Sequence, residues 1–413
     1  MLWINFLHLY QPPAAPELVV REATEKSYDR ILRLLEKNPR LRFTLNITGC
    51  LLARWPAIGR SDILNRLSVL ARQKRIEITG TAAYHPILPL VDRHEVVRQI
   101  RENEAILAKY LDAPWARKGF FLPEMAYSPL IAKMVKKLGY RWLILDEIAQ
   151  DGRLRKDFSG AISHDRQSGL DLILRSRVLS NTFVPKEIAA RLDEKKPDEP
   201  ETVLITGTDA ELYGLRYLDQ SRIMEKLCAR PDLKTSLISA YLDRVGVSRS
   251  VCAPGPHSWQ TTEKEYRRRE PFNLWQDRKN SLHRLLWQLA DLAYQAVEKN
   301  ARDANYPYAR GHIVRGLASC VFWWASGRDL NLFSPTAWNP DEIERGALEM
   351  IRAIRSLDNP RTRALKMAGE RIYDRLISLI WRRHWQKYWR PERIKKFAAV
   401  LGREKNYSAR PRL

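Results

Sequence analysis

Long apolar runs and closely spaced cysteines are both missing from this 413-residue chain. No apolar stretch reaches the ~20 residues that a membrane-spanning helix needs. The first eight residues contain no basic segment and no small-residue cleavage site, so they do not look like a signal peptide. No Cys-x-x-Cys pair is present, which argues against a zinc site and against a disulfide framework. We therefore expect a cytoplasmic protein with reduced, mostly buried thiols. The cysteines are Cys50, Cys228, Cys252 and Cys320.

Low-complexity segments and short internal repeats are absent as well, and the composition is that of a globular chain, with 45% hydrophobic and 29% charged residues. The formal net charge is +23, and residues 351–413 hold 18 basic and 5 acidic residues, a net charge of +13. A basic segment of this kind attracts anionic polymers or membrane surfaces. No RNA- or DNA-binding motif accompanies it, so we expect no specific recognition of nucleic acid.

Short apolar runs alternate with amphipathic stretches through the first ~270 residues, a pattern typical of βαβ units around a parallel sheet. The number of repeated units favours a barrel over a small open sheet. The predicted strands are 2–9, 42–47, 75–79, 119–122, 141–145 and 202–206, and the predicted helices are 28–37, 62–73, 94–110 and 128–138.

From about residue 271 the periodicity becomes helical throughout, over 273–300, 312–326, 341–357 and 363–389. We therefore predict an α/β fold with a catalytic barrel at 1–270, a helical domain at 271–390 that closes the cleft, and a basic tail at 391–413. Trp381, Trp385 and Trp389 recur every four residues, which predicts a terminal helix whose tryptophans dock on the helical domain.

Polar residues follow several predicted strands, at the edge where catalytic groups of parallel α/β barrels lie. Two of these segments carry a carboxylate immediately after an apolar strand, Glu124 in the first and Asp209 in the second. Cleavage of a glycosidic bond uses two carboxyl groups, and in the retaining case they lie ~5–5.5 Å apart. A loop carboxylate that caps a helix or pairs with an arginine is the ordinary alternative for each residue alone. Four such polar segments in order favour the catalytic interpretation.

The four segments together resemble glycoside hydrolase family 57. They are His8-Leu9-Tyr10-Gln11-Pro12, Ile76-Glu77-Ile78-Thr79-Gly80, Phe121-Leu122-Pro123-Glu124-Met125-Ala126 and Asp209-Ala210-Glu211-Leu212-Tyr213-Gly214. Two further segments agree with it, namely Leu45-Asn46-Ile47-Thr48-Gly49 and Ser319-Cys320-Val321-Phe322-Trp323-Trp324. The family contains α-amylases, 4-α-glucanotransferases, branching enzymes and amylopullulanases.

The resemblance implies a (β/α)7 barrel followed by a helical domain, acting on α-glucans or maltooligosaccharides with retention of configuration and without a metal or other cofactor. It implies that Glu124 is the nucleophile and Asp209 the general acid and base. The residues it implies for substrate binding are His8, Tyr10, Gln11, Glu77, His85, Glu211, Trp323 and Trp324.

The chain departs from the family pattern at Tyr10, where the first motif usually has a second histidine. Leu215-Arg216-Tyr217 stands where branching enzymes have His-Trp-Trp, which makes branching activity less expected. Two alternatives stay open at this point. One is a barrel that binds glucan without catalysis. The other is a polysaccharide deacetylase, which needs an Asp-His-His metal triad that the sequence does not offer convincingly.

Overall fold

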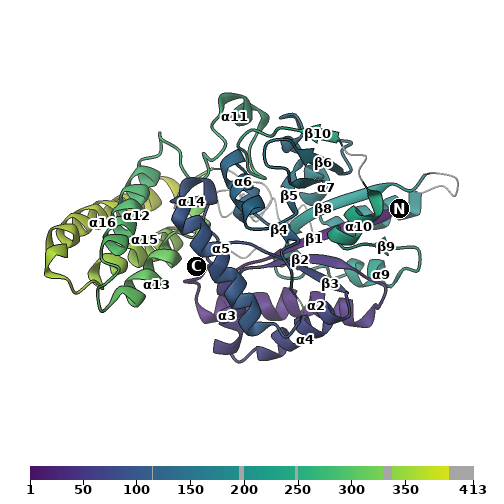
Figure 1. The fold of residues 1–413 in the computed structure, drawn as a ribbon, viewed down its shortest axis with the longest axis horizontal. Helices are drawn as coiled ribbons and strands as arrows, with labels where there is room; N and C mark the ends of the chain where they lie inside the picture. The colour runs from purple at the N-terminus through teal and green to yellow at the C-terminus, as the bar shows by residue number, and fades with distance from the viewer. Residues whose placement is uncertain (114, 195–199, 247–249, 329–336, 390–413) are drawn as a thin grey trace.

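Parallel strands form the centre of the molecule (Figure 1). The computed structural model describes residues 1–113, 115–194, 200–246, 250–328 and 337–389. The parallel strands of the barrel are β1 (Leu2–Leu9), β2 (Phe43–Ile47), β3 (Ile76–Thr79), β4 (Gly119–Phe120), β5 (Trp142–Asp146), β7 (Asp171–Arg175) and β8 (Val203–Asp209). Their near-continuous apolar burial is the pattern expected of parallel strands that are covered on both faces.

Two seams close these strands into a barrel with the order β8-β1-β2-β3-β4-β5-β7. The ladders β3-β2-β1-β8 and β7-β5-β4 are regular. Beyond the end of β3, Gly80 bridges to Phe120 of β4, and its amide donates to the Gly119 carbonyl at 2.9 Å. On the other side the Ser176 amide, just after β7, donates to the Ile205 carbonyl of β8 at 2.9 Å. Within the described residues this gives seven parallel strands, as the predicted (β/α)7 barrel requires.

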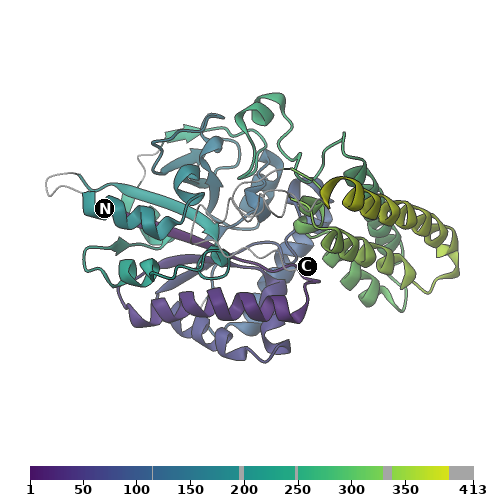
Figure 2. The same ribbon diagram turned by 180° about the vertical axis from the view of Figure 1, so that it is seen from behind.

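Helices and short additional strands surround the barrel (Figure 2). The helices are α1 (Glu17–Ala23), α2 (Asp29–Lys37), α3 (Gly49–Ala57), α4 (Ser61–Arg72), α5 (Arg93–Tyr110), α6 (Pro129–Lys137), α7 (Arg177–Ser180), α8 (Val184–Glu194), α9 (Ile223–Ala229), α10 (Ile238–Val245) and α11 (Glu263–Arg268). Shorter helical turns are η1 (Thr24–Tyr28), η2 (Leu88–Leu90), η3 (Pro123–Met125), η4 (Glu147–Ala149) and η5 (Ala210–Leu212). The additional strands are β6 (Ala161–Asp165), antiparallel to β7, and β9 (Lys234–Thr235) and β10 (Ser250–Cys252).

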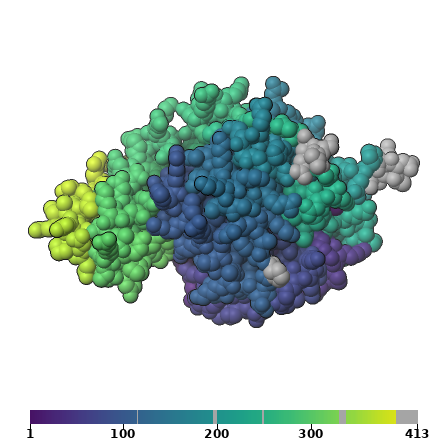
Figure 3. Space-filling view, in the orientation of Figure 1, coloured from purple at the N-terminus to yellow at the C-terminus, as the bar shows by residue number. Residues whose placement is uncertain are grey.

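The last helices form a bundle on one side of the barrel (Figures 1 and 2). They are α12 (Ser281–Lys299), α13 (Tyr306–Gly316), α14 (Ser319–Trp324), α15 (Pro340–Arg355), η6 (Pro360–Thr362), α16 (Arg363–Arg383) and η7 (His384–Tyr388). Their apolar faces share one core that also takes in Ile87 and Ala126 from the barrel loops. Below, "helical region" means the segment from α12 to η7. Its first helix α12 and the barrel helix α5 meet at the surface (Figure 3).

Ion pairs join the barrel and the helical region. Arg98 of α5 donates to both carboxylate oxygens of Glu298 of α12, at 2.7 and 3.0 Å. Arg310 of α13 donates to Glu95 of α5 at 2.9 Å, and the Glu95 side chain is fully buried. A buried carboxylate depends on its partner because water cannot replace it. Arg310 therefore anchors the helical region more firmly than an exposed ion pair would.

Most sequence-predicted elements are confirmed, and the differences have local causes. The strand β7 was not predicted. The predicted helix 273–300 begins later, at Ser281, because the Asn280 side chain accepts a hydrogen bond from the Leu282 amide and caps the helix there. The predicted helix 312–326 is two helices, α13 and α14.

The tryptophan stripe docks only in part, which corrects the prediction. Trp381 packs on the helical core, whereas the side chains of Trp385 and Trp389 are 57% and 54% exposed. The predicted division at 270/271 stays a prediction, and the predicted tail 391–413 lies outside the described residues. Among the described helices, none combines the length and the apolar character that a membrane span requires. The four cysteines are free thiols.

Replacing Arg310 with methionine tests the anchor. We expect the free energy of unfolding to fall by about 3 kcal/mol, because the fully buried Glu95 carboxylate loses its cation. Urea denaturation monitored by tryptophan fluorescence measures the change. The matched control is Arg141→Met, which breaks an exposed ion pair with Asp243 and is expected to cost less than about 1 kcal/mol. Equal effects of the two substitutions would contradict the anchor, and Glu95→Leu combined with Arg310→Met should recover part of the loss.

Candidate active site

The carboxyl ends of β1, β2 and β8 bring the first and fourth sequence motifs side by side. His8 pairs in register with Asp209 of β8 on one side and with Asn46 of β2 on the other. The His8 Nδ1 lies 2.8 Å from the Asn46 Oδ1, and the Asn46 amide donates to Thr79 of β3 at 3.1 Å. These polar groups form a layer inside the barrel at the edge where catalytic groups of such barrels lie.

Glu124 enters this layer from the turn that follows β4. Its backbone is left-handed, with φ +60°, a conformation that non-glycine residues adopt at a cost and that recurs at functional sites. One carboxylate oxygen accepts the indole N–H of Trp259 at 2.8 Å, and the other accepts the hydroxyl of Ser319 at 3.0 Å. The side chain is only 14% exposed. Neutral donors from two distant segments therefore set its orientation.

Burial, and then the nearby charge of Asp209, raise the pKa of Glu124 from 4.5 to about 7, against the two hydrogen bonds. Asp209 is partly exposed, and within the described residues its carboxylate accepts no hydrogen bond. The negative charge of Asp209 thus favours the protonated form of Glu124, because like charges repel. The pair is therefore suited to a reaction in which one group gives up a proton while the other is ionised.

Stacked rings form a wall beside the carboxylates. The imidazole of His85 stacks with His8, at 4.8 Å between ring centres, and with Tyr10, at 4.1 Å, and the His8 and Tyr10 ring centres are 5.7 Å apart. Burial lowers the pKa of His8 and lowers that of His85 well below its ordinary value, so both rings are neutral near pH 7. The Tyr10 hydroxyl lies 3.3 Å from the Cys320 thiol. Tyr10 thus occupies its place in the wall as a neutral ring.

Gln11 and Glu211 lie together, one layer behind the carboxylates. The Gln11 amide donates to the Glu211 carboxylate at 2.9 Å, and the Tyr28 hydroxyl donates to the same oxygen. Burial, and then the charge of Asp209, raise the pKa of Glu211 to about 7. Both predicted residues thus lie near Asp209, and Glu211 is engaged by protein partners.

Glu77 lies apart from the group, and its role in substrate binding stays a prediction. It pairs in register with Thr44, two residues nearer the amino end of the barrel than the layer of Asn46. Its carboxylate accepts the Ser239 amide at 3.1 Å and also the Ser239 hydroxyl, at the first turn of α10. An acidic group at a helix N-terminus satisfies free backbone N–H groups. The structure therefore gives Glu77 the role of holding α10 under the barrel.

Trp323 and Trp324 are half-buried and pack against each other, with ring centres 4.5 Å apart, and against the core of the helical region. The described side-chain contacts of α14 with this group of residues come from its first two residues. Ser319 bonds to Glu124, and Cys320 lies against the Tyr10 hydroxyl. Substrate binding by Trp323 and Trp324 stays a prediction.

Three further residues at the site were not predicted. Trp259 lies on the segment between β10 and α11, and no regular pattern marks it. Ser319 stands in a motif whose tryptophans attracted the prediction. Arg175 ends β7, where its guanidinium carbon lies 5.1 Å from the centre of the Trp259 ring and its side chain donates to Asp146 at 3.1 Å. The Arg175 guanidinium thus packs over the ring of Trp259.

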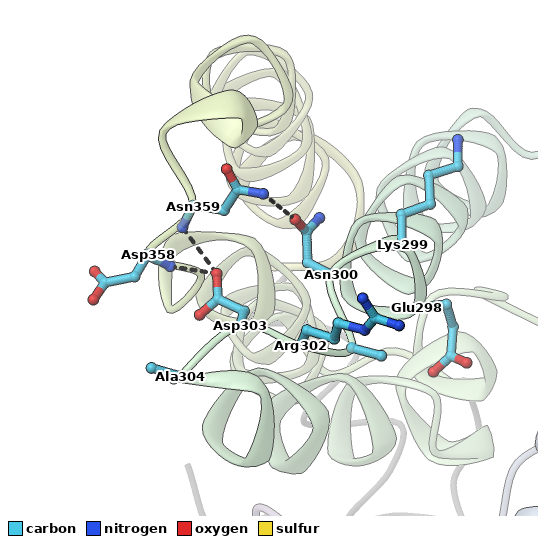
Figure 4. Close-up of a pocket in the computed structure, with 9 residues that line it drawn as sticks. Glu298, Lys299, Asn300, Arg302, Asp303, Ala304, Asp358 and Asn359 are labelled. Atoms are coloured by element: carbon cyan, nitrogen blue, oxygen red, sulfur yellow. Dashed lines mark hydrogen bonds between the residues drawn. The ribbon is translucent and has the colours of Figure 1, made fainter.

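A separate hollow lies in the helical region (Figure 4). It measures about 690 Å³ and is lined by residues 298–304, 358 and 359 of the helical region. The Asp303 carboxylate inside it accepts the amides of Asp358 and Asn359 at 2.9 and 2.8 Å. It contains none of the predicted site residues, so we assign it no role in the chemistry. Among the described residues, no three or more His, Cys, Asp or Glu side chains are grouped to hold a metal ion.

The family model of glycosyl hydrolase family 57 matches residues 7–246, more than half of the chain. The chain belongs to glycosyl hydrolase family 57. The match takes in Glu124, Asp209 and the histidine wall, but it ends before Trp259 and Ser319.

Curated relatives of this family 57 chain include α-amylase 1 of Dictyoglomus thermophilum, 24% identical over 216 residues, which are 51% of this chain and 31% of the relative. Another is a 4-α-glucanotransferase of Thermococcus litoralis, 26% identical over 147 residues, 35% of this chain and 22% of the relative. The matches thus span about a third or less of the length of these relatives.

Solved structures share the fold over most of the chain. The 4-α-glucanotransferase of Thermococcus litoralis superposes with a TM-score of 0.65 at 18% identity, covering 87% of this chain and 60% of that one. A branching enzyme of Thermococcus kodakaraensis superposes with a TM-score of 0.64 at 14% identity, covering 91% and 95%. The expected architecture, a barrel followed by a helical domain, is therefore confirmed.

The raised pKa of Glu124 makes stability depend on pH in a defined direction. Between pH 4.5 and about 7 the folded chain keeps a proton that the unfolded chain has lost, so stability falls as pH rises through this window. Glu124→Gln removes the effect. We expect it to raise the free energy of unfolding by about 2 kcal/mol at pH 8 and by much less at pH 5.

Denaturant unfolding at the two pH values checks this expectation. Glu17→Gln, an exposed carboxylate in a surface ion pair, serves as the control and should change stability little at either pH. A stability difference between Glu124→Gln and the unsubstituted protein that is the same at pH 5 and pH 8 would contradict the burial of an ionisable group at this position.

Proposed function

We propose that this family 57 chain is a retaining enzyme that acts on α-1,4-linked glucans or maltooligosaccharides, as a hydrolase or a glucanotransferase. The observation that carries the proposal is the pair Glu124 and Asp209, which lie at the ends of different strands, with the charge of Asp209 raising the pKa of Glu124. The names of the relatives, α-amylase and 4-α-glucanotransferase, support the substrate class. Because this chain matches only part of each relative, the activity of the whole protein remains our proposal.

In the proposed reaction, a Glu124 oxygen attacks the anomeric carbon while Asp209 donates its proton to the departing glycosidic oxygen. The bond from the anomeric carbon to the leaving sugar breaks, and a covalent ester to Glu124 forms. Asp209, now ionised, then takes a proton from water or from a sugar hydroxyl as that oxygen attacks the same carbon. Two inversions leave the anomeric configuration unchanged.

The proton must lie on Asp209 when the reaction starts, whereas burial favours the protonated form of Glu124 in the free protein. In the proposed reaction the bound substrate favours ionised Glu124. Protonated Asp209 donates a hydrogen bond to the glycosidic oxygen of the bound substrate. The positive charge that develops at the anomeric carbon stabilises ionised Glu124. The hydrogen bonds from Trp259 and Ser319 favour the same ionised state.

The neutral ring wall supports the sugar class and leaves the acceptor open. The side chains of His8, Tyr10 and His85 combine flat apolar faces with hydrogen-bonding atoms, as pyranose rings require. Whether water or a sugar takes the glycosyl group depends on how well water is excluded from the ester. We further propose a cytoplasmic location, which the four free thiols support, and contact of the basic C-terminal region with anionic surfaces.

Product analysis with maltoheptaose tests the activity. We expect new products, with glucose and short oligomers from hydrolysis or a ladder of longer oligomers from transfer. Glu124→Gln is expected to lower the rate at least about 1,000-fold, because no nucleophile is left to form the ester. Binding of glycogen without any turnover by the unsubstituted protein would contradict catalysis and favour the non-catalytic barrel.

Azide rescue tests which carboxylate has which role. With an α-maltosyl fluoride donor, Glu124→Ala plus azide should give the β-glycosyl azide, because azide attacks directly from the face that Glu124 occupied. Asp209→Ala plus azide should give the α-glycosyl azide through the ester on Glu124. The surface variant Asp243→Ala should give neither azide above the level of the unsubstituted protein. The β-product from Asp209→Ala would exchange the two assignments.

A further inference from the structure

Ser319 begins α14 and reaches from the helical region to the barrel. Its backbone amide donates to the carbonyl of His85 at 2.9 Å, and its neighbour Ala318 bridges to Pro86. Its hydroxyl oxygen lies 3.0 Å from a Glu124 carboxylate oxygen and 2.9 Å from the Nδ1 of His85. Ser319 itself is fully buried, so no water competes for these positions.

The direction of the two hydrogen bonds follows from the number of protons. A serine hydroxyl carries one proton and accepts through its lone pairs, whereas an ionised carboxylate only accepts. With Glu124 ionised, the hydroxyl of Ser319 must donate to Glu124, so the proton of the other bond must come from His85 Nδ1. A neutral His85 then has an unprotonated Nε2, an atom that is buried and unpartnered within the described residues.

We propose that Ser319 is a positioning residue through which the helical region orients the Glu124 carboxylate and favours its ionised form, with His85 completing the chain. The inference rests on the proposed function and deepens it. Ser319 does not contact the reacting carbon in this proposal. It acts through the nucleophile, and docking of the helical region is therefore a condition for a correctly held nucleophile.

Among the described groups that face Glu124, Ser319 and Trp259 favour its ionised form, whereas the others oppose it or are neutral. Asp209 of β8 opposes ionisation of Glu124 by its charge. Burial raises the pKa of Tyr10 well above its ordinary value and that of Cys320 to about 12, and burial lowers that of His85, so these three groups stay neutral near pH 7. The hydrogen bonds from the Trp259 indole and the Ser319 hydroxyl thus offset both burial and the charge of Asp209.

The test compares Ser319→Ala with Ser319→Thr, which keeps the hydroxyl, and with Ser356→Ala, which removes an exposed hydroxyl bonded to a backbone carbonyl of the same region. The Glu124 carboxyl is titrated by ¹³C NMR and identified by its loss in Glu124→Gln. In Ser319→Ala we expect its titration, and the acid limb of kcat/KM, to move up by roughly one pH unit. In the same variant we expect kcat to fall about 10-fold and KM to change less than about 2-fold. Ser319→Thr should restore most of the lost kcat. Ser356→Ala should have the kcat and the Glu124 titration of the unsubstituted protein.

A Glu124 titration that stays in place in Ser319→Ala would overturn the inference even if the activity fell. If the unsubstituted protein turns over no glucan, the proposed function fails, while the NMR titration still decides the role of Ser319. The tautomer of His85 in the unsubstituted protein gives a second readout that needs no folded variant. Long-range ¹H–¹⁵N spectra at pH 8 should show the proton on Nδ1, and a proton on Nε2 would overturn the proposal.

Discussion

The two hydrogen bonds that hold the Glu124 carboxylate join three distant parts of the chain at one point. The turn after β4 supplies the carboxylate, the segment before α11 supplies the Trp259 indole, and α14 supplies the Ser319 hydroxyl. Each bond is made away from water, where losing one partner would leave a polar atom unsatisfied. The positions of these segments are therefore linked energetically, and the barrel and the helical region form one site rather than two neighbours.

The same burial creates a tension inside the site. It makes the hydrogen bonds to Glu124 strong, and it also disfavours the charge that a nucleophile needs. The ring-bearing barrel residues beside Glu124 are neutral, so they add no further charge to the site. The imidazoles of His8 and His85 stay uncharged, and the Tyr10 ring stacks beside them. A cation in their place would stabilise the ionised carboxylates at rest but would also hold them more tightly than a reaction cycle allows.

The sequence predicts the parts of the fold that depend on local pattern. Apolar runs revealed β1, β2 and β5, and a carboxylate after an apolar strand revealed Glu124 and Asp209, because strand ends and helix faces have short periods. The depth of Glu77 in the barrel was not predicted, because depth depends on register, which a single strand does not encode. Trp259 was missed because its contact with Glu124 spans 135 residues and lies on a loop without periodicity. Ser319 lies in a segment that the sequence comparison with the family singled out. It was not predicted, because a single hydroxyl in a sequence indicates a sugar-binding site less strongly than two tryptophans do.

The spread of the site along the chain also has a consequence for how the protein matures. Its groups run from His8 to Ser319, so a nascent chain that has completed every strand of the barrel still lacks the hydroxyl that holds Glu124. The family match itself ends at residue 246, before both donors to that carboxylate. During synthesis the last barrel strand is therefore complete before either donor to the Glu124 carboxylate has been made, and both donors are present only after Ser319 has been added.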